Sequence, residues 1–250
     1  MDYERILSKK IQYEAGKHNI HAVTLSSCEK EFEIAFIHHS TAIEGNTLTL
    51  METKVLLEDE ISIGGKSLRE IYEVVNHKKA YDFVKKCVAE QQKLTEAIAK
   101  EIHFILMENI MTGGIYRNHE VRISGAVHVP PAGTDMYIQI KNFYTDLEWK
   151  RECMNPIEYA AWIHGEFVRI HPFSDGNGRT SRLLMNYQLM AEGFLPVSVT
   201  KENRLEYYEA LEHYAVEGEM EWFSDLVAEL EEQQLDKYLR LIEVKYPAAT

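Results

Sequence analysis

The 250-residue sequence predicts an all-α fold, a helical bundle that carries one short β-hairpin and has a helical region at its N-terminus. Three observations lead to this prediction. Apolar residues recur three and four positions apart through most of the chain, helix-capping signals separate these stretches, and only one segment alternates polar and apolar residues. The hydrophobic fraction of 45% and the charged fraction of 27% are typical of an ordinary globular protein.

Start and stop signals place the helices along the chain. Ser67-Leu68-Arg69-Glu70 has the pattern of a capping box, and Asn155-Pro156 puts proline at its favoured first position in a helix. Glycines mark helix ends, as in Gly45-Asn46 and Gly113-Gly114. Helices are therefore expected over about residues 2–16, 28–44, 67–88, 95–112, 155–170, 179–191 and 219–245.

Residues 117–131 break the helical pattern. Polar and apolar residues alternate there around Ser124-Gly125, which is typical of a two-stranded hairpin. An isolated hairpin is only marginally stable, so the segment has two interpretations. It is either a surface connector or a flap whose unpaired edge accepts another strand. As a flap, its contact residues would be Arg122, Ile123, Ser124, Gly125, Val127 and His128.

The charge and composition restrict the partners. A net charge of −13 and the lack of a basic stripe argue against binding DNA or RNA, although a mononucleotide is still compatible with them. No apolar run approaches the roughly 20 residues that span a bilayer, and the N-terminus lacks the apolar stretch of a signal peptide. The scattered cysteines Cys28, Cys87 and Cys153 fit free thiols in a reducing compartment. We therefore expect a cytoplasmic protein that binds neither nucleic acid nor membranes.

The chemically informative residues are concentrated in segment 171–182, His-Pro-Phe-Ser-Asp-Gly-Asn-Gly-Arg-Thr-Ser-Arg. Gly176-Asn177-Gly178 comes directly before a strongly helical stretch. Several backbone N–H groups and the positive end of the helix dipole would therefore meet at one place, which favours an anion. Arg179 and Arg182 lie three residues apart near the same helix end, and their guanidinium groups suit phosphate oxygens.

Two further groups would complete a reactive site. Asp175 offers a hard carboxylate for Mg²⁺ (or Mn²⁺) that bridges phosphates. His171 titrates near neutrality and is a natural general base. Each of these features alone is more often structural than functional. Their occurrence together within twelve residues favours a functional site.

Segment 171–182 resembles the Fic family signature, HxFx(D/E)GNGRxxR, at every fixed position. The resemblance implies a Fic helical bundle, with an N-terminal helical region at 1–95, a catalytic core at 96–220 and a C-terminal helix at 221–250 that packs on the core. It also implies a protein adenylyltransferase (AMPylator). Such an enzyme transfers AMP from Mg-ATP to a Ser, Thr or Tyr hydroxyl of a target protein, including itself by auto-AMPylation.

The family resemblance also implies a role for each residue of the motif. His171 would be the catalytic base, Asp175 the metal ligand and Phe173 the core anchor that fixes the loop. The nucleotide would be held by Gly176, Asn177, Gly178, Arg179, Arg182, Tyr207 and Tyr208. The hairpin would be the flap that aligns the target segment by strand addition.

A second motif suggests a built-in inhibitor. Ser40-Thr41-Ala42-Ile43-Glu44-Gly45 resembles the family's inhibitory-helix pattern, (S/T)xxxE(G/N), within the helix at about 28–45. A carboxylate in the last turn of a helix opposes the helix dipole by roughly 0.3–1 kcal/mol, which hints at a partner outside the helix. The resemblance implies that Glu44 pairs with Arg182 and takes the place of the γ-phosphate. In some relatives the same glutamate positions the water that removes AMP, and the sequence does not decide between these roles.

Several alternatives are weighed against this interpretation. A non-catalytic nucleotide-sensing or partner-binding module could keep the loop, but here every catalytic position is intact. A transferase that uses another diphosphate donor would have the same loop. A transcription regulator is disfavoured because residues 219–245 are too short and too acidic for a DNA-binding domain. Gly178 stands where Doc-type relatives have lysine. A homo-oligomer that holds the Glu44 helix in place is compatible with the sequence.

Overall fold

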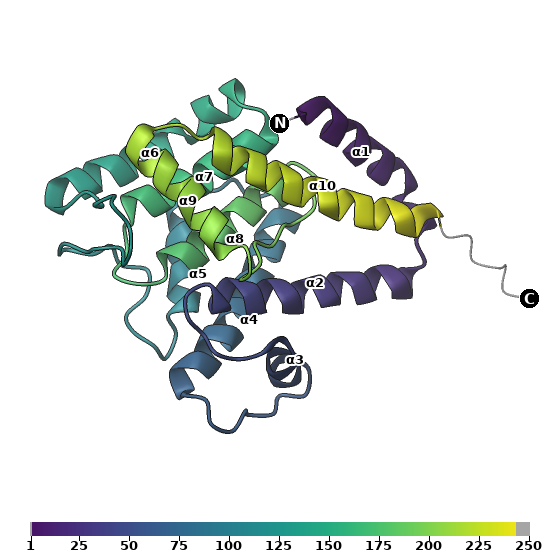
Figure 1. The fold of residues 1–250 in the computed structure, drawn as a ribbon, viewed down its shortest axis with the longest axis horizontal. Coiled ribbons are helices and arrows are strands. Elements are labelled where there is room, and N and C mark those ends of the chain that lie inside the picture. Colours follow the sequence, from purple (N-terminus) through teal and green to yellow (C-terminus); the bar gives the residue numbers. More distant parts are fainter. Residues whose placement is uncertain (1, 244–250) are drawn as a thin grey trace, which may run out of the picture.

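The computed structural model describes residues 2–243, which form an all-helical molecule without a β-strand (Figure 1). The predicted all-α class is therefore confirmed. The elements, in chain order, are α1 (Tyr3–Gly16), the 3₁₀ helix η1 (Lys17–Asn19), α2 (Ala22–Ala42), α3 (Leu50–Glu58), α4 (Leu68–Ala89), α5 (Glu96–Leu106), α6 (Gly133–Cys153), α7 (Pro156–Ile170), α8 (Asn177–Ala191), α9 (Arg204–Glu217) and α10 (Glu221–Glu243). None of the helices in this described part of the chain is long and apolar enough to cross a bilayer.

Helices α7 and α8 pack against each other at the centre of the molecule. The start of α7 is fixed by its sequence, because Asn155 Oδ1 accepts hydrogen bonds from the amides of Ile157 (3.1 Å) and Glu158 (3.0 Å) and Pro156 takes the first helical position. Helix α8 is surrounded by α2, α4, α5 and α7, so nearly all of its side chains are buried. The residues that open α8 are therefore held in a rigid core.

The N-terminal region joins the core at two places. Helix α1 packs on α10, where the rings of Tyr13 and Tyr238 meet edge to face at 5.6 Å. Helix α2 packs on α3 and α4 and contacts α8. Figure 1 shows α2 and α10 extending to the same side of the molecule from the compact group of the other helices. The end of α2 thereby reaches the start of α8.

Some helix starts agree with the prediction and others do not. Helix α4 starts after Ser67, whose capping box with Glu70 is formed. Helix α2 begins at Ala22, before the expected Cys28, because the ring of His21 caps it, which is an unusual cap. Helices α3, α6 and α9 are missing from the prediction, although α3 has a capping box, and α6 starts without any capping side chain.

The predicted β-hairpin at 117–131 is wrong as a pair of strands. The central turn does form, with Gly125 at φ +83° and the amide of Ala126 donating to the carbonyl of Ile123 (3.2 Å). The flanking amides find other partners, because those of Val127 and His128 both donate to Oε1 of Glu212 in α9, each at 2.7 Å. The Glu212 carboxylate thus replaces the hydrogen bonds that a second strand would have made, and the segment is an irregular loop.

Candidate active site

His171 terminates α7 in a left-handed conformation, with φ +52°, which is uncommon outside glycine. Its amide still donates to the carbonyl of Phe167 (3.0 Å), and its own carbonyl accepts from Nε of Arg117 (2.7 Å). Ring atom Nδ1 lies 3.3 Å from the carbonyl of Val168. A proton on Nδ1 satisfies that carbonyl and leaves Nε2 with a free lone pair. The backbone thus fixes both the orientation of the imidazole and the tautomer that can accept a proton.

The imidazole of His171 is neutral at physiological pH. Its burial lowers the pKa to about 4, and the hydrogen bond to the carbonyl of Val168 only partly opposes this effect. The ring therefore meets a substrate in its unprotonated form. A general base needs that form, although the lowered pKa also makes the imidazole a weaker base.

The turn that follows His171 is fastened to the core through Phe173. Its ring is fully buried and stacks on His103, with centroids 3.6 Å apart and planes 2° apart. The side chain of Asn177 closes the turn, because its Oδ1 accepts from the amide of Phe173 and its Nδ2 donates to the carbonyl of Phe173, both at 2.9 Å. Phe173 thus anchors the loop in the core, as the sequence predicts. The Asn177 side chain instead points into the loop, and both its oxygen and its nitrogen bind the backbone of Phe173.

Two glycines lie where the turn enters α8, and side chains approach both closely. Gly176 has φ +75°, and a Cβ atom there would lie 2.3 Å from Cε of Met107. A Cβ atom on Gly178 would lie only 2.2 Å from Oε1 of Glu44. The first amides of α8 have no acceptor within the helix, as at every helix start, and they add to the positive end of its dipole. The carboxylate of Glu44, from a distant part of the chain, therefore lies directly against this turn.

That carboxylate forms an ion pair with Arg182. Nη2 of Arg182 donates to Oε1 of Glu44 at 2.7 Å, and the guanidinium is almost fully buried. Ser40 accepts twice more, at Oγ from Nε (2.9 Å) and at its carbonyl from Nη2 (2.7 Å), and the Tyr207 hydroxyl accepts from Nη1 (3.1 Å). Burial alone would lower the pKa of Arg182, but Tyr207 and Glu44 outweigh it and raise the pKa. Arg182 is thus a fixed cation that faces Glu44.

Two buried histidines support this arrangement, and the sequence prediction misses both. Nε2 of His77 lies 2.8 Å from Oγ of Ser40, and Nε2 of His164 lies 3.0 Å from the hydroxyl of Tyr207. Burial lowers the pKa of His77 to about 3 and the pKa of His164 also falls, so both rings are neutral. A lone histidine inside a helix carries no local signal of such a role, because its partners lie on other helices.

Tyr207 and Tyr208, the two residues predicted to contact adenine, have different surroundings in the structure. Tyr207 is buried and holds Arg182, as described above. Tyr208 is partly exposed, and its hydroxyl donates to the carbonyl of Ile43 (3.1 Å) at the end of the α2 segment. Both rings line a cavity of about 850 Å³. Other groups that line the cavity include Glu44, His171, Gly178 and the turn of the flap at 123–128. His171, Gly178 and the loop at 123–128 thus share one cavity.

Asp175 and Arg179 belong to the same segment but are not among the residues that line this cavity. Oδ1 of Asp175 accepts from the amide of Gly176 (2.5 Å) and lies 3.3 Å from Nη2 of Arg179, while Oδ2 pairs with Arg69 of α4. Burial works against ionisation of Asp175, but Arg179, the amide and Arg69 outweigh it and lower its pKa. Within residues 2–243 no group of three or more His, Cys, Asp or Glu side chains could hold a metal ion. A single carboxylate suits Mg²⁺ when phosphate oxygens and water supply the other ligands.

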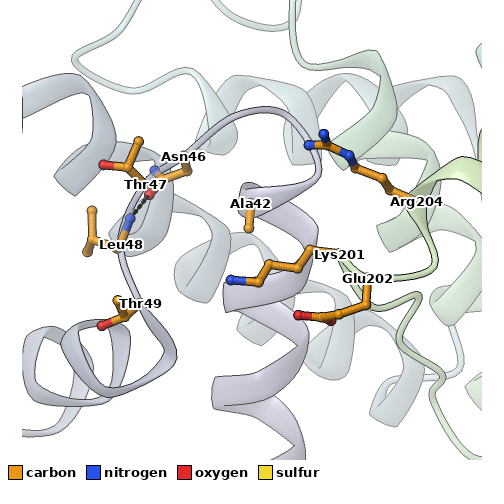
Figure 2. A pocket seen from close by; sticks show the side chains of 8 residues that line it. All are labelled: Ala42, Asn46, Thr47, Leu48, Thr49, Lys201, Glu202 and Arg204. Atoms are coloured by element: carbon orange, nitrogen blue, oxygen red, sulfur yellow. Dashed lines mark hydrogen bonds between the residues drawn. The ribbon is translucent and has the colours of Figure 1, made fainter.

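Figure 2 shows a second hollow, of about 380 Å³, between the loop that follows α2 and the segment that leads into α9. Lys201 and Arg204 lie on one side of it, and Thr47 and Thr49 lie on the other. No residue that the sequence assigns to the active site lines this hollow. The larger cavity is lined instead by Glu44, His171, Gly178, Tyr207 and Tyr208.

A neutral imidazole and a helix start line one cavity, and a fixed arginine is bound to the Glu44 carboxylate that also lines it. These groups are compatible with transfer chemistry on a phosphorylated ligand. Residues 93–189 match the model of the Fic/DOC family. The chain is 38% identical over 221 residues to a protein adenylyltransferase Fic of Aedes aegypti and 37% identical over 227 residues to one of Culex quinquefasciatus. These matches cover 87% and 88% of this chain but only 44% and 45% of the relatives.

Solved structures agree with this result. Fic-1 of C. elegans (residues 134–508) superposes with a TM-score of 0.84 at 31% identity, covering 96% of this chain and 72% of that one. A Fic-domain protein of Bacteroides thetaiotaomicron has a TM-score of 0.85 at 22% identity over 98% of this chain and all of that one, which shows the same fold. The chain belongs to the Fic/DOC family. It spans less than half the length of the curated relatives named above.

Proposed function

We propose that the chain is a protein adenylyltransferase that moves AMP from ATP to a Ser, Thr or Tyr hydroxyl of a target protein. The observation that carries this proposal is the position of Glu44. Its carboxylate lies against Gly178 and pairs with buried Arg182 in the cavity that His171 lines. A site that holds one anion at this point is built to hold another, and the relatives named above are adenylyltransferases.

The residues divide the chemistry between them. The target hydroxyl attacks the α-phosphorus of ATP, and Nε2 of His171 takes the proton of that hydroxyl. A new oxygen–phosphorus bond forms to AMP as the bond to the β-phosphate breaks, and pyrophosphate leaves. The amides at the start of α8 and Arg182 stabilise the phosphate charge, and positioning supplies most of the rate. Asp175 would hold Mg²⁺ or Mn²⁺, which neutralises phosphate charge when it is bound.

Glu44 inhibits this reaction in the proposal. Its carboxylate uses the guanidinium nitrogen of Arg182 that would otherwise contact the γ-phosphate. Glu44 lies in the turn just after α2, and Ser40, in the last turn of α2, accepts from Nε and Nη2 of the same guanidinium. Breaking a buried ion pair leaves a charge without a partner, which costs about 3–5 kcal/mol. Because Glu44 is itself only partly buried, we expect the low end of that range and a low, measurable basal activity.

The direct test compares two glutamate-to-glycine variants. Purified Glu44→Gly protein is incubated with Mg-ATP, and the mass of the intact chain is measured. We expect the gain of one AMP or more, at least tenfold faster than in the wild type, because the γ-phosphate can then reach Arg182. Glu60→Gly is the matched control, since Glu60 lies in the loop after α3 and has φ +56°, which glycine accepts without strain.

His171→Ala in the Glu44→Gly background separates transfer from binding. The double variant should bind ATP but gain no AMP. A non-catalytic nucleotide-sensing module would bind ATP and gain no AMP even with His171 present, and that result would overturn the proposal. A transferase that uses another diphosphate donor would modify the protein with a different added mass. The cytoplasmic location, self-association and the flap's role in strand addition stay predictions from the sequence.

A further inference from the structure

Four charged side chains form a closed ring beside the loop of the active site. Arg69 contacts Oδ2 of Asp175 through Nη2 and lies 3.1 Å from Oε1 of Glu73 through Nε. Arg179 completes the ring, with Nη1 at 3.5 Å from Oε1 of Glu73 and Nη2 at 3.3 Å from Oδ1 of Asp175. Two cations and two carboxylates thus alternate, and Asp175 has one cation on each oxygen.

The two arginines of the ring differ in their freedom to move. The side chain of Arg179 is 2% exposed, so it is held by the packing around α8. The side chain of Arg69 is 57% exposed and reaches Asp175 from the surface of α4. Oδ1 of Asp175 is also fixed by the amide of Gly176 (2.5 Å). Oδ2 is therefore the oxygen that an incoming ion can reach, and Arg69 is the partner that can leave.

Arg69 is also poorly placed for helix stability. It lies in the first turn of α4, Leu68–Ala89, where the helix dipole disfavours a cation. The contacts of Arg69 with Asp175 and Glu73 explain its position better than any contribution to the stability of α4. A divalent ion on Oδ2 would meet the guanidinium of Arg69 at close range, and like charges repel. Each cation therefore weakens the binding of the other at this oxygen.

We propose that Arg69 is a displaceable cation that competes with the divalent metal for Oδ2 of Asp175 and so sets the metal concentration at which the site fills. This inference rests on the proposed function, because it takes Asp175 as the metal ligand. Without metal, Arg69 neutralises Asp175 and keeps the loop in place. When metal and nucleotide are bound, the Arg69 side chain turns to solvent. Removing Arg69 should therefore make metal binding tighter.

The test measures Mn²⁺ binding itself. The Glu44→Gly protein is saturated with a non-hydrolysable ATP analogue, and free Mn²⁺ is followed by its electron paramagnetic resonance signal. Adding Arg69→Ala should tighten Mn²⁺ binding about two- to fivefold, the range expected for the loss of one surface ion pair. Arg69→Lys keeps the charge and should stay near the parent value. Thermal unfolding of each variant checks that the fold is intact.

Lys79→Ala is the matched control. Lys79 lies on the same helix, is 53% exposed and pairs with Glu108 at 2.6 Å, so its loss changes the net charge equally. It is ten residues from Arg69, about 15 Å along the helix. Its Mn²⁺ affinity should equal that of the parent. Equal tightening in Lys79→Ala and Arg69→Ala would overturn the inference, because net charge alone would then explain the effect.

Two other results would also overturn it. Unchanged or weaker Mn²⁺ binding in Arg69→Ala would show that Arg69 does not compete with the metal, while the proposed transfer activity would stand. Unchanged Mn²⁺ binding in Asp175→Ala would remove Asp175 as the ligand, and with it the metal role given under the proposed function. Comparing these two variants therefore separates a failure of the inference from a failure of the function.

Discussion

At the scale of single residues, burial decides which chemical form each group takes. His171 illustrates this point, because the end of α7 places its ring against the carbonyl of Val168 inside the protein. Burial lowers its pKa to about 4, the hydrogen bond to Val168 raises it in part, and Glu44 also raises it slightly. The folded protein therefore holds a neutral base over the whole physiological range of pH.

The pH dependence of transfer tests this conclusion. In the Glu44→Gly variant, kcat/KM for AMP transfer should change by less than about twofold between pH 8 and pH 6, because a base with a lowered pKa stays unprotonated until the pH approaches that pKa. Removing Glu44 lowers the pKa of His171 further, because the Glu44 carboxylate raises it. Circular dichroism at each pH verifies folding. A loss of activity with a midpoint near 6.5, the value of an ordinary histidine, would contradict the burial argument.

At the scale of elements, α10 contains a carboxyl group that the fold keeps protonated. Glu231 is completely buried, and its Oε1 accepts from the amide of Leu195 at 2.9 Å. Burial raises its pKa to about 8, although that hydrogen bond and Lys10 act in the opposite direction. The native protein thus binds a proton that the unfolded chain, with an ordinary glutamate, releases near pH 4.5. Stability from this group is present below that pH and is lost as the pH rises to about 8.

Glu231→Gln should remove this pH dependence. The free energy of unfolding is compared between the variant and the wild type at each pH. The variant's value minus the wild-type value should rise by about 1–3 kcal/mol from pH 5 to pH 8, since each unit of pKa shift corresponds to about 1.4 kcal/mol. Urea unfolding at the two pH values measures the difference. Glu229→Gln is the control, because Glu229 is an exposed glutamate on the same helix. Parallel pH curves for the wild type and Glu231→Gln would mean that Glu231 is ionised in the folded protein.

Some elements with local signals could be predicted from the sequence, although α3 is missing from the prediction despite its capping box at Thr49. The capping boxes at Ser67 and Asn155 fix helix starts through contacts within four residues, so α4 and α7 begin where expected. The turn at Ser124-Gly125 also forms. The flanking strands do not, because Glu212 in α9 takes the amides of Val127 and His128, and no pattern within 117–131 contains that information.

At the scale of the whole molecule, the candidate site depends on contacts between distant segments. Ser40 and Glu44 reach Arg182 across the contact between α2 and α8, and Tyr207 reaches it from α9. The short motif at 171–182 identifies the loop because its parts act within twelve residues. The support from His77 and the ring through Arg69 arise only when α4 packs on α8, so sequence patterns alone could not predict them.

The convergence of these segments on one phosphate group is tested most directly by a crystal structure of the Glu44→Gly variant with Mg²⁺ and a non-hydrolysable ATP analogue. The γ-phosphate should contact Arg182 where Glu44 lay, the amides at 177–179 should contact the other phosphates, and Nε2 of His171 should face the α-phosphorus. A nucleotide bound outside the cavity, or an imidazole turned away from the α-phosphorus, would contradict the account.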